Sequence, residues 1–206
     1  MDDKKNAAKL GKDIKEFIAH GSKESFEKIY NHYFDKIYRF VFLKIYDRHI
    51  AEDISSEVFF TAYRSMGKTN LNYYSFNAWI YKIAANKTID YLRKNKKFIE
   101  ESLSDEQSEI NINLTENEEK IFSESSFYLK KEFGFNNENL YKALNMLPDS
   151  QKNVVLLKFV EDLDYRYIAA ILDKKEPAVR ALVFRAMINI KNIYQKLTDG
   201  DKIKDE

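Results

Sequence analysis

Residues 76–97, FNAWIYKIAANKTIDYLRKNKK, carry two stripes of different chemistry at one helical period. Apolar side chains recur at steps of three and four residues: Phe76, Trp79, Ile80, Ile83 and Ala84. Polar and charged side chains follow the same period on another side: Lys82, Asn86, Asp90, Arg93 and Lys97. This spacing predicts an α-helix that buries one side in a core and leaves the other side available for binding.

The available side of this helix is basic. Between Asn77 and Phe98 the only acid is Asp90, and it is accompanied by six bases: Lys82, Lys87, Arg93, Lys94, Lys96 and Lys97. Such a concentration of positive charge attracts phosphate groups. Lys-rich solvated surfaces are also common, so charge alone does not distinguish a binding surface from an ordinary helix face.

Few residues interrupt helices in this chain. Its 206 residues include five glycines and two prolines, and 44% of them are hydrophobic. Strand-like alternation bounded by turns is hard to find, so we predict an all-α protein with compact cores. The absence of cysteine excludes disulfides, thiolate metal sites and a cysteine nucleophile.

No apolar run approaches the roughly 20 residues that a membrane-spanning helix requires. The amino-terminal segment MDDKKNAAKLGKD also lacks the apolar centre of a signal peptide. We therefore expect a cytoplasmic protein without direct membrane insertion.

The middle of the chain is acidic, although the whole chain has a net charge of +1. Residues 99–126 contain nine acids and one base, in a context rich in Ser, Asn and Glu. This composition is typical of a flexible linker. We therefore expect an amino-terminal helical domain over 1–98, an acidic flexible linker over 99–134 and a second small helical domain over 135–206.

Three further helices are expected before residue 76. A short apolar face ends at His20-Gly21, where glycine can adopt the left-handed conformation that closes a helix, and Ser22 can cap the next helix. A 3.6-residue period then extends from Phe26 to Val41.

The third of these helices, AEDISSEVFFTAY at 51–63, has two contrasting faces. Four small or aliphatic residues point inward: Ala51, Ile54, Val58 and Ala62. Asp53, Glu57 and Phe60 occupy another face, and an acidic face with a phenylalanine favours a protein partner. Single surface phenylalanines occur in any protein, so the face alone leaves this partner open.

The segment MGKTNLNYYS at 66–75 is expected to be a loop beside the basic helix. Its aromatic rings could stack on unpaired bases and its amides could read freed base edges. The residues concerned are Asn70, Asn72, Tyr73 and Tyr74. A plain connecting loop would have a similar composition.

The carboxy-terminal part has the spacing of a helix-turn-helix. Pro148 separates two helices, and a short helix over Tyr165–Leu172 is followed by a polar turn and a longer helix that begins at Pro177. In this motif the second helix enters the major groove. It therefore needs basic side chains near its start and apolar residues on the side that packs against the protein. Arg180 and Arg185 are the basic side chains. The apolar residues are Val179, Val183, Ala186 and Ile190.

Taken in order, these segments resemble the extracytoplasmic-function group of bacterial sigma factors, the RNA polymerase subunits that select and open promoters. SFEKIYNHYFDKIYRFV resembles the group's first signature helix, AEDISSEVFFTAY its polymerase-clamp helix and FNAWIYKIAANKTIDYLRKNKK its promoter-melting helix. LNMLPDSQKNVVLLKFVEDLDYRYIAAIL with AVRALVFRAM resembles the carboxy-terminal helix-turn-helix. The resemblance covers about residues 14–195, apart from the linker.

The resemblance implies partners and sites. Core polymerase would bind Asp53, Ser56, Glu57 and Phe60. The melted minus-ten strand would bind Asn70, Asn72, Tyr73, Tyr74, Lys82, Asn86, Lys87, Asp90, Arg93 and Lys94. Minus-thirty-five duplex would bind Lys174, Lys175, Arg180 and Arg185. Promoter DNA and an anti-sigma protein complete the implied partners, and the resemblance implies neither a cofactor nor a metal.

The chain departs from the family pattern at several positions. Ser56 stands where the family often has glutamine, and Tyr167 precedes Ile168 and Ala169 where glutamate is usual. The recognition helix reads AVRALV at 178–183, against a usual Thr-Val-Lys-Ser-Arg-Leu. Base contacts are each worth about 1–3 kcal/mol of discrimination, so these losses weaken the expectation of duplex reading.

Two functions other than that of a sigma factor have to be compared with the sequence. A sigma-like regulator that acts through protein partners would account for the altered recognition helix. An enzyme that acts on nucleic acid has little support, because His20, His32 and His49 lack metal-ligand spacing and the chain has no glycine-rich phosphate loop. We therefore expect a promoter-specificity subunit that is not an enzyme.

Overall fold

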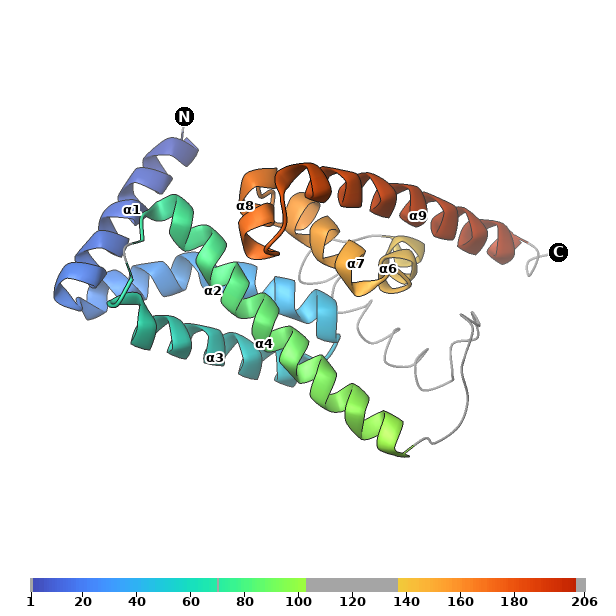
Figure 1. The fold of residues 1–206 in the computed structure, drawn as a ribbon, viewed down its shortest axis with the longest axis horizontal. Coiled ribbons are helices and arrows are strands. Elements are labelled where there is room, and N and C mark those ends of the chain that lie inside the picture. The colour runs from blue at the N-terminus through green and yellow to red at the C-terminus, as the bar shows by residue number, and fades with distance from the viewer. Residues whose placement is uncertain (1, 70, 103–136, 203–206) are drawn as a thin grey trace. The chain divides into compact units, whose positions relative to one another are not determined.

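The computed structural model describes residues 2–69, 71–102 and 137–202, and every regular element in these ranges is helical (Figure 1). The predicted all-α class is confirmed. Packing groups the chain into two compact units, Met1–Ser104 with Leu163–Lys174 and Asp105–Asp162 with Lys175–Glu206.

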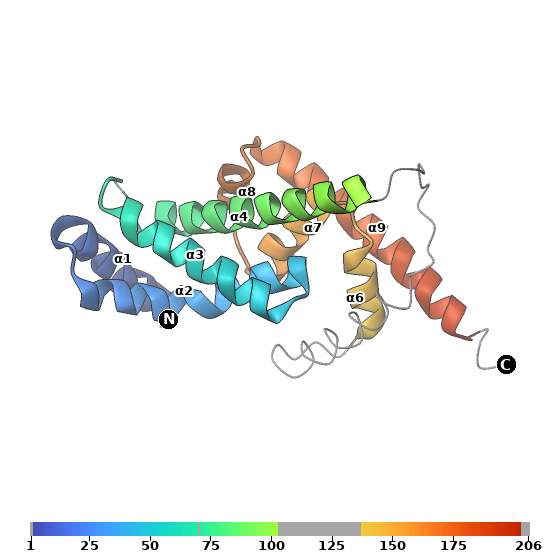
Figure 2. The ribbon, with the colours of Figure 1, turned by 90° about the horizontal axis from the view of Figure 1, so that it is seen from below.

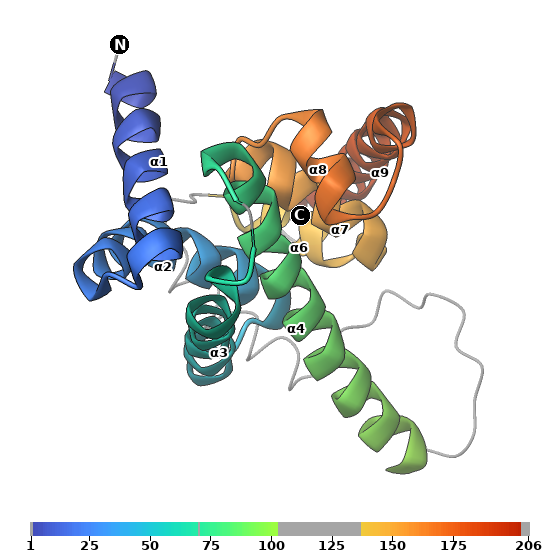
Figure 3. The same ribbon diagram turned by 60° about the vertical axis from the view of Figure 1, so that its left-hand side comes forward.

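Four long helices build the first unit: α1 (Asp2–His20), α2 (Lys23–Ile45), α3 (Arg48–Met66) and α4 (Tyr73–Ser102). Helices α2, α3 and α4 pack pairwise against one another, as Figure 2 shows, and α1 packs on α2 and α4. The short helix α8 (Tyr165–Ile171) contacts α4 and completes the unit. This arrangement makes α3 and α4 neighbours in space (Figure 3).

Aromatic side chains fill the core between these helices. The ring of Phe40 on α2 meets the ring of Tyr81 on α4 edge-on, with centroids 5.7 Å apart, and Tyr33 lies 5.2 Å from Phe76. All four side chains are almost fully buried. Aromatic pairs add about 0.5–1.5 kcal/mol beyond the burial of their area, so these contacts fix α4 against α2.

The predicted boundary between the first two helices is confirmed. Gly21 has a φ of 65°, the left-handed value that a glycine adopts without strain, and Ser22 accepts a hydrogen bond from the backbone N–H of Ser25 at 3.3 Å. The glycine and the serine therefore end one helix and start the next within two residues.

The second unit packs short helices on a long one. Its elements are α6 (Glu138–Asn145), α7 (Asp149–Val155), the π-helical turn η1 (Leu156–Val160) and α9 (Glu176–Lys202). Both α6 and α7 pack against α9. The four residues predicted to face inward are buried, which confirms that prediction: Val179, Val183, Ala186 and Ile190.

The expected division into 1–98, 99–134 and 135–206 stays a prediction. Helix α4 continues to Ser102, four residues into the range expected to be linker, and residues 103–134 of that range lie outside the described residues. The packing that groups Leu163–Lys174 with the first unit also cuts across the expected carboxy-terminal domain.

Candidate functional site

Helix α4 separates its apolar stripe from its polar stripe as predicted. Phe76, Ile80 and Ala84 are fully buried, whereas most of the polar stripe faces solvent. Its exposed members are Asn86, Asp90 and Arg93, and the neighbouring Lys94 is exposed as well. The side chain of Lys97 lies outside the described residues. Trp79 and Ile83, which were predicted to be core residues, are half-buried because they lie at the edge of the packed side. The exposed side offers amide, carboxylate and cationic groups along one helix.

Two lysines of α4, one in the polar stripe and one beside it, are held in ion pairs. The ammonium of Lys82 lies 2.6 Å and 2.8 Å from the two carboxylate oxygens of Asp173. The ammonium of Lys87 lies 3.0 Å from Glu57 Oε2 on α3. Both lysines are half-buried, so the pairs direct their charged ends while the aliphatic parts pack.

The segment before α4 differs from the predicted loop. Helix α4 begins at Tyr73, so Tyr73 and Tyr74 belong to its first turn instead of a loop that extends to residue 75. The cause is Asn72, whose Oδ1 accepts a hydrogen bond from the backbone N–H of Ser75 at 3.0 Å, while its own N–H donates to Ser75 Oγ at 2.8 Å. This reciprocal cap starts the helix early.

The side chain of Asn72 therefore stabilises the start of α4, because its amide oxygen accepts a hydrogen bond within the chain. The predicted strand-reading residue Asn70 lies outside the described residues, as do the side chains of Tyr73 and Tyr74. Their proposed contacts with bases stay predictions.

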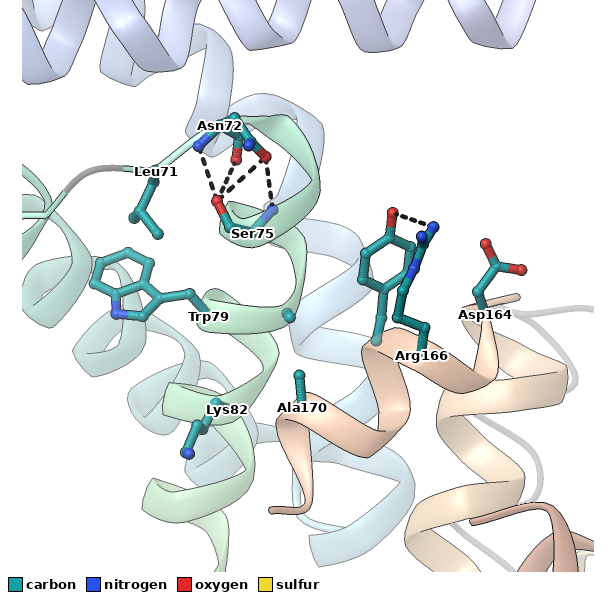
Figure 4. Close-up of a pocket in the computed structure, with 10 residues that line it drawn as sticks. Leu71, Asn72, Ser75, Trp79, Lys82, Asp164, Arg166 and Ala170 are labelled. Carbon is teal, nitrogen blue, oxygen red and sulfur yellow. Dashed lines mark hydrogen bonds between the residues drawn. The ribbon is translucent and has the colours of Figure 1, made fainter. Parts of the chain in front are cut away.

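A hollow lies beside the start of α4, and Figure 4 shows the side chains that line it. Trp79 faces it from α4, and the guanidinium of Arg166 on α8 lies over the ring of Tyr167 at 5.1 Å. The hollow therefore combines aromatic and cationic surface. The remaining lining residues are Leu71, Asn72, Ser75, Ala78, Lys82, Asp164 and Ala170.

Helix α3 presents the predicted acidic face to solvent. Asp53, Ser56, Glu57 and Phe60 are all exposed, and the side chain of Phe60 is 62% accessible. The guanidinium of Arg64 lies 5.4 Å from the centroid of the Phe60 ring, which steadies the ring without covering it. The face thus offers two carboxylates, a hydroxyl and an aromatic ring to a partner.

The cations predicted to read duplex DNA are exposed. Lys174 and Lys175 lie in the turn between α8 and α9, and Arg180 and Arg185 lie on α9. Arg180 Nε is 3.2 Å from Glu176 Oε1, and Arg185 Nε donates to the backbone carbonyl of Ala181 at 3.4 Å. Both arginines therefore lie along the outer side of α9.

Several apolar residues of α9 do not pack into the core of the second unit. Phe184, Met187 and Ile188 are exposed, and Phe184 is 68% accessible. The helix period already predicts this result, because Phe184 follows the buried Val183 and falls on the outer side.

Within the described ranges, no group of three or more His, Cys, Asp and Glu residues is placed to hold a metal ion. No helix in those same ranges is long and apolar enough to cross a membrane.

Two family models and several known proteins match this chain. Residues 29–98 match the model of sigma-70 region 2, and residues 137–190 match the model of sigma-70 region 4. The chain is 26% identical over 172 residues to the ECF RNA polymerase sigma factor SigM of Bacillus subtilis, covering 84% of this chain and 96% of that protein. It is 29% identical over 175 residues to SigW of the same organism, covering 82% and 88%.

Two solved structures share the fold. The structure of CnrH in complex with the cytosolic domain of CnrY has a TM-score of 0.63 at 14% identity, covering 93% of this chain and 99% of that chain. The sigma factor RpoE in complex with the anti-sigma factor NepR from Bartonella quintana has a TM-score of 0.61 at 18% identity, covering 84% and 98%.

Two helical regions of one family, in the same order and over more than half of the chain, define a class of transcription regulators. The chain therefore belongs to the sigma-70 family of RNA polymerase sigma factors, in its extracytoplasmic-function group, and acts in transcription initiation.

Proposed function

We propose that this sigma factor binds core RNA polymerase through α3 and holds the separated minus-ten strand on α4. One observation carries the proposal: an exposed acidic and aromatic face on α3 adjoins an exposed cationic and amide face on α4, on helices that pack together. The first face suits a basic protein surface, and the second suits a phosphate track with bases to read. The protein does no covalent chemistry in this proposal.

The polymerase contact uses Asp53, Ser56, Glu57 and Phe60. Exposed carboxylates around a large aromatic ring provide both charge complementarity and an anchor that can enter a pocket on the partner. The short side chain of Ser56 contributes less area than a glutamine would, so Phe60 carries more of the binding.

The strand contact uses the polar stripe of α4 together with Lys87 and Lys94. Asn86 and Arg93 can donate to base edges and phosphates, and Lys82, Lys87 and Lys94 can follow the backbone. Asp90 keeps the stripe from being uniformly positive and can accept a hydrogen bond from an exocyclic amine. Asn70, Asn72, Tyr73 and Tyr74 are proposed to complete this site at the start of the helix.

Reading of the minus-thirty-five duplex is assigned to Lys174, Lys175, Arg180 and Arg185. These cations favour phosphate contacts, which set position more than sequence. An anti-sigma protein is the proposed inhibitor, supported by the complex of the structural relative RpoE with the anti-sigma factor NepR. The protein is proposed to act in the cytoplasm, where core polymerase and promoter DNA are found.

The exposed side chains of Phe184, Met187 and Ile188 motivate a second candidate function, a regulator that acts mainly through protein partners. Such a protein would bind core polymerase without initiating on any promoter from its source genome.

One experiment separates the two functions. Purified protein and core polymerase are incubated with fragmented source DNA, and the starts of the transcripts are mapped. A sigma factor produces starts that share sequence elements about ten and thirty-five base pairs upstream, as the family pattern implies. Core binding without any specific start supports the second candidate.

A further inference from the structure

Glu57 and Lys87 join the two functional faces of the first unit. Glu57 belongs to the acidic face of α3, and Lys87 is one of the cationic residues of α4 that are proposed to bind the strand. Their charged ends are 3.0 Å apart, with side-chain accessibilities of 67% for the glutamate and 27% for the lysine. One ion pair therefore has one partner on each proposed binding surface.

The two partners differ in how freely they can move. The glutamate side chain is mostly in solvent, so a basic group of another protein can approach its carboxylate without unfolding anything. The lysine stem is largely covered, so its ammonium has a limited choice of positions. Removal of Glu57 from the pair would leave the Lys87 charge close to its present place but without its counter-ion.

A carboxylate and a phosphate compete for the same ammonium. In the free subunit a DNA strand must displace Glu57 before Lys87 can pair fully with a phosphate. A basic surface that binds Glu57 removes this competition, because the carboxylate then has another partner.

We propose that Glu57 is a positioning residue that masks Lys87 in the free subunit and releases it when core polymerase binds. The inference rests on the proposed function of the two faces. Polymerase binding and strand binding are then coupled through one exchange of ionic partners, and the coupling is reciprocal: a bound strand strengthens polymerase binding by the same factor.

The expected size of the effect follows from the exposure of the pair. Solvent-exposed ion pairs are worth about 0.2–1 kcal/mol, which corresponds to a change in binding of up to about fivefold. The free subunit is thus expected to bind strands weakly, and the exchange adds a modest gain to the larger contributions of the other contacts.

The test uses the full chain and a labelled oligothymidylate, which has a phosphate backbone and no duplex. Glu57→Gln is expected to bind the oligonucleotide about two- to fivefold more tightly than the wild type. The slope of log affinity against log salt should steepen by about 0.7, the increment for one additional phosphate contact on a single strand. A merely structural role of Glu57 would not change this slope.

Glu52→Gln is the matched control. It removes the same charge from the same helix and breaks the ion pair of Glu52 with Arg48. Both residues of that pair lie on α3, one turn apart, so the pair does not involve α4. This control is expected to change the affinity by less than about 1.5-fold, since its effect is limited to screened long-range charge. A gain equal to that of Glu57→Gln would overturn the inference.

A double substitution tests whether the gain passes through the lysine. In a Lys87→Gln background, Glu57→Gln is expected to add nothing, whereas a persisting gain contradicts the exchange. The proposed function has a separate readout. If wild-type protein initiates from mapped promoters but Glu57→Gln leaves strand affinity unchanged, only the coupling is refuted; if specific initiation is also absent, the proposed function is refuted as well.

Discussion

The side chain of Asp47 accepts a hydrogen bond from the backbone N–H of Ile50 at 3.0 Å and thereby caps α3. The preceding residue, Tyr46, has a φ of 59° and ends α2. A left-handed residue followed by an extended one turns the chain within two positions. The cap sets where α3 starts, and so it sets the orientation of Asp53, which lies six residues further on.

We predict that Asp47→Ala lowers the free energy of unfolding by about 1 kcal/mol, because it leaves a donor at the helix start without its partner. Urea unfolding followed by circular dichroism measures the change. Asp47→Ser retains a capping oxygen and should recover most of the loss. Equal stabilities for the alanine variant and the wild type would show that the cap contributes nothing.

Stability should depend on pH through His32. Burial of the ring, together with the nearby charge of Lys36, holds the pKa of His32 below its usual value of 6.5. The Nζ of Lys36 lies 3.0 Å from Nε2 of His32, a contact that suits a neutral imidazole. Below pH 6.5 the unfolded chain therefore binds a proton more readily than the folded chain, so acidification favours unfolding.

Wild-type protein is accordingly expected to lose unfolding free energy as the pH falls from 6.5 toward the lowered pKa of His32, and to keep this contribution in full above that range. His32→Gln removes the titrating group and should make the decline shallower. Denaturant unfolding at several pH values between 7.5 and 5 provides the comparison. An unchanged decline in the variant would assign the pH dependence to other groups.

Core polymerase binding should depend on Asp53. Asp53→Lys reverses a charge of the acidic face and is predicted to weaken core binding by about thirtyfold or more, as expected when a hot-spot residue of an interface meets a like charge. Because Asp53 is exposed, the fold should be retained. Binding is measured with a labelled sigma subunit titrated by core polymerase.

Asp35→Lys makes the same charge change at an exposed position on α2. It should leave the affinity for core polymerase within about twofold of the wild type, since Asp35 is not part of the acidic face and exposed charges act on one another only weakly through salt. Retained binding by Asp53→Lys would remove the acidic face from the polymerase contact.

Much of the helical layout could be predicted from the sequence because local rules decide it. The 3.6-residue period, the left-handed glycine at Gly21 and the cap at Ser22 act over a single turn, and the structure contains all of them. The inward face of α9 was predicted for the same reason. The polar stripe of α4 followed from its period.

The remaining features depend on contacts between helices that are distant in the sequence. Tyr81 is 1% exposed and Thr88 is fully buried, although neither lies on the predicted apolar stripe. Helix α4 packs against α1, α2 and α3, so its buried arc is wider than one stripe. The ion pair between Glu57 and Lys87 likewise depends on the register of α3 against α4, which no local pattern specifies.

The proposed binding of a separated strand by α4 is tested most directly by measuring transcription initiation on fully paired and on premelted templates. Asn86→Ala and Arg93→Ala remove exposed groups from the polar stripe, and Asn192→Ala removes an exposed amide from α9 as a control. If the stripe supplies free energy for strand separation, both α4 variants lose more activity on a fully paired promoter than on one whose minus-ten region is already open. Equal losses on the two templates would contradict the account.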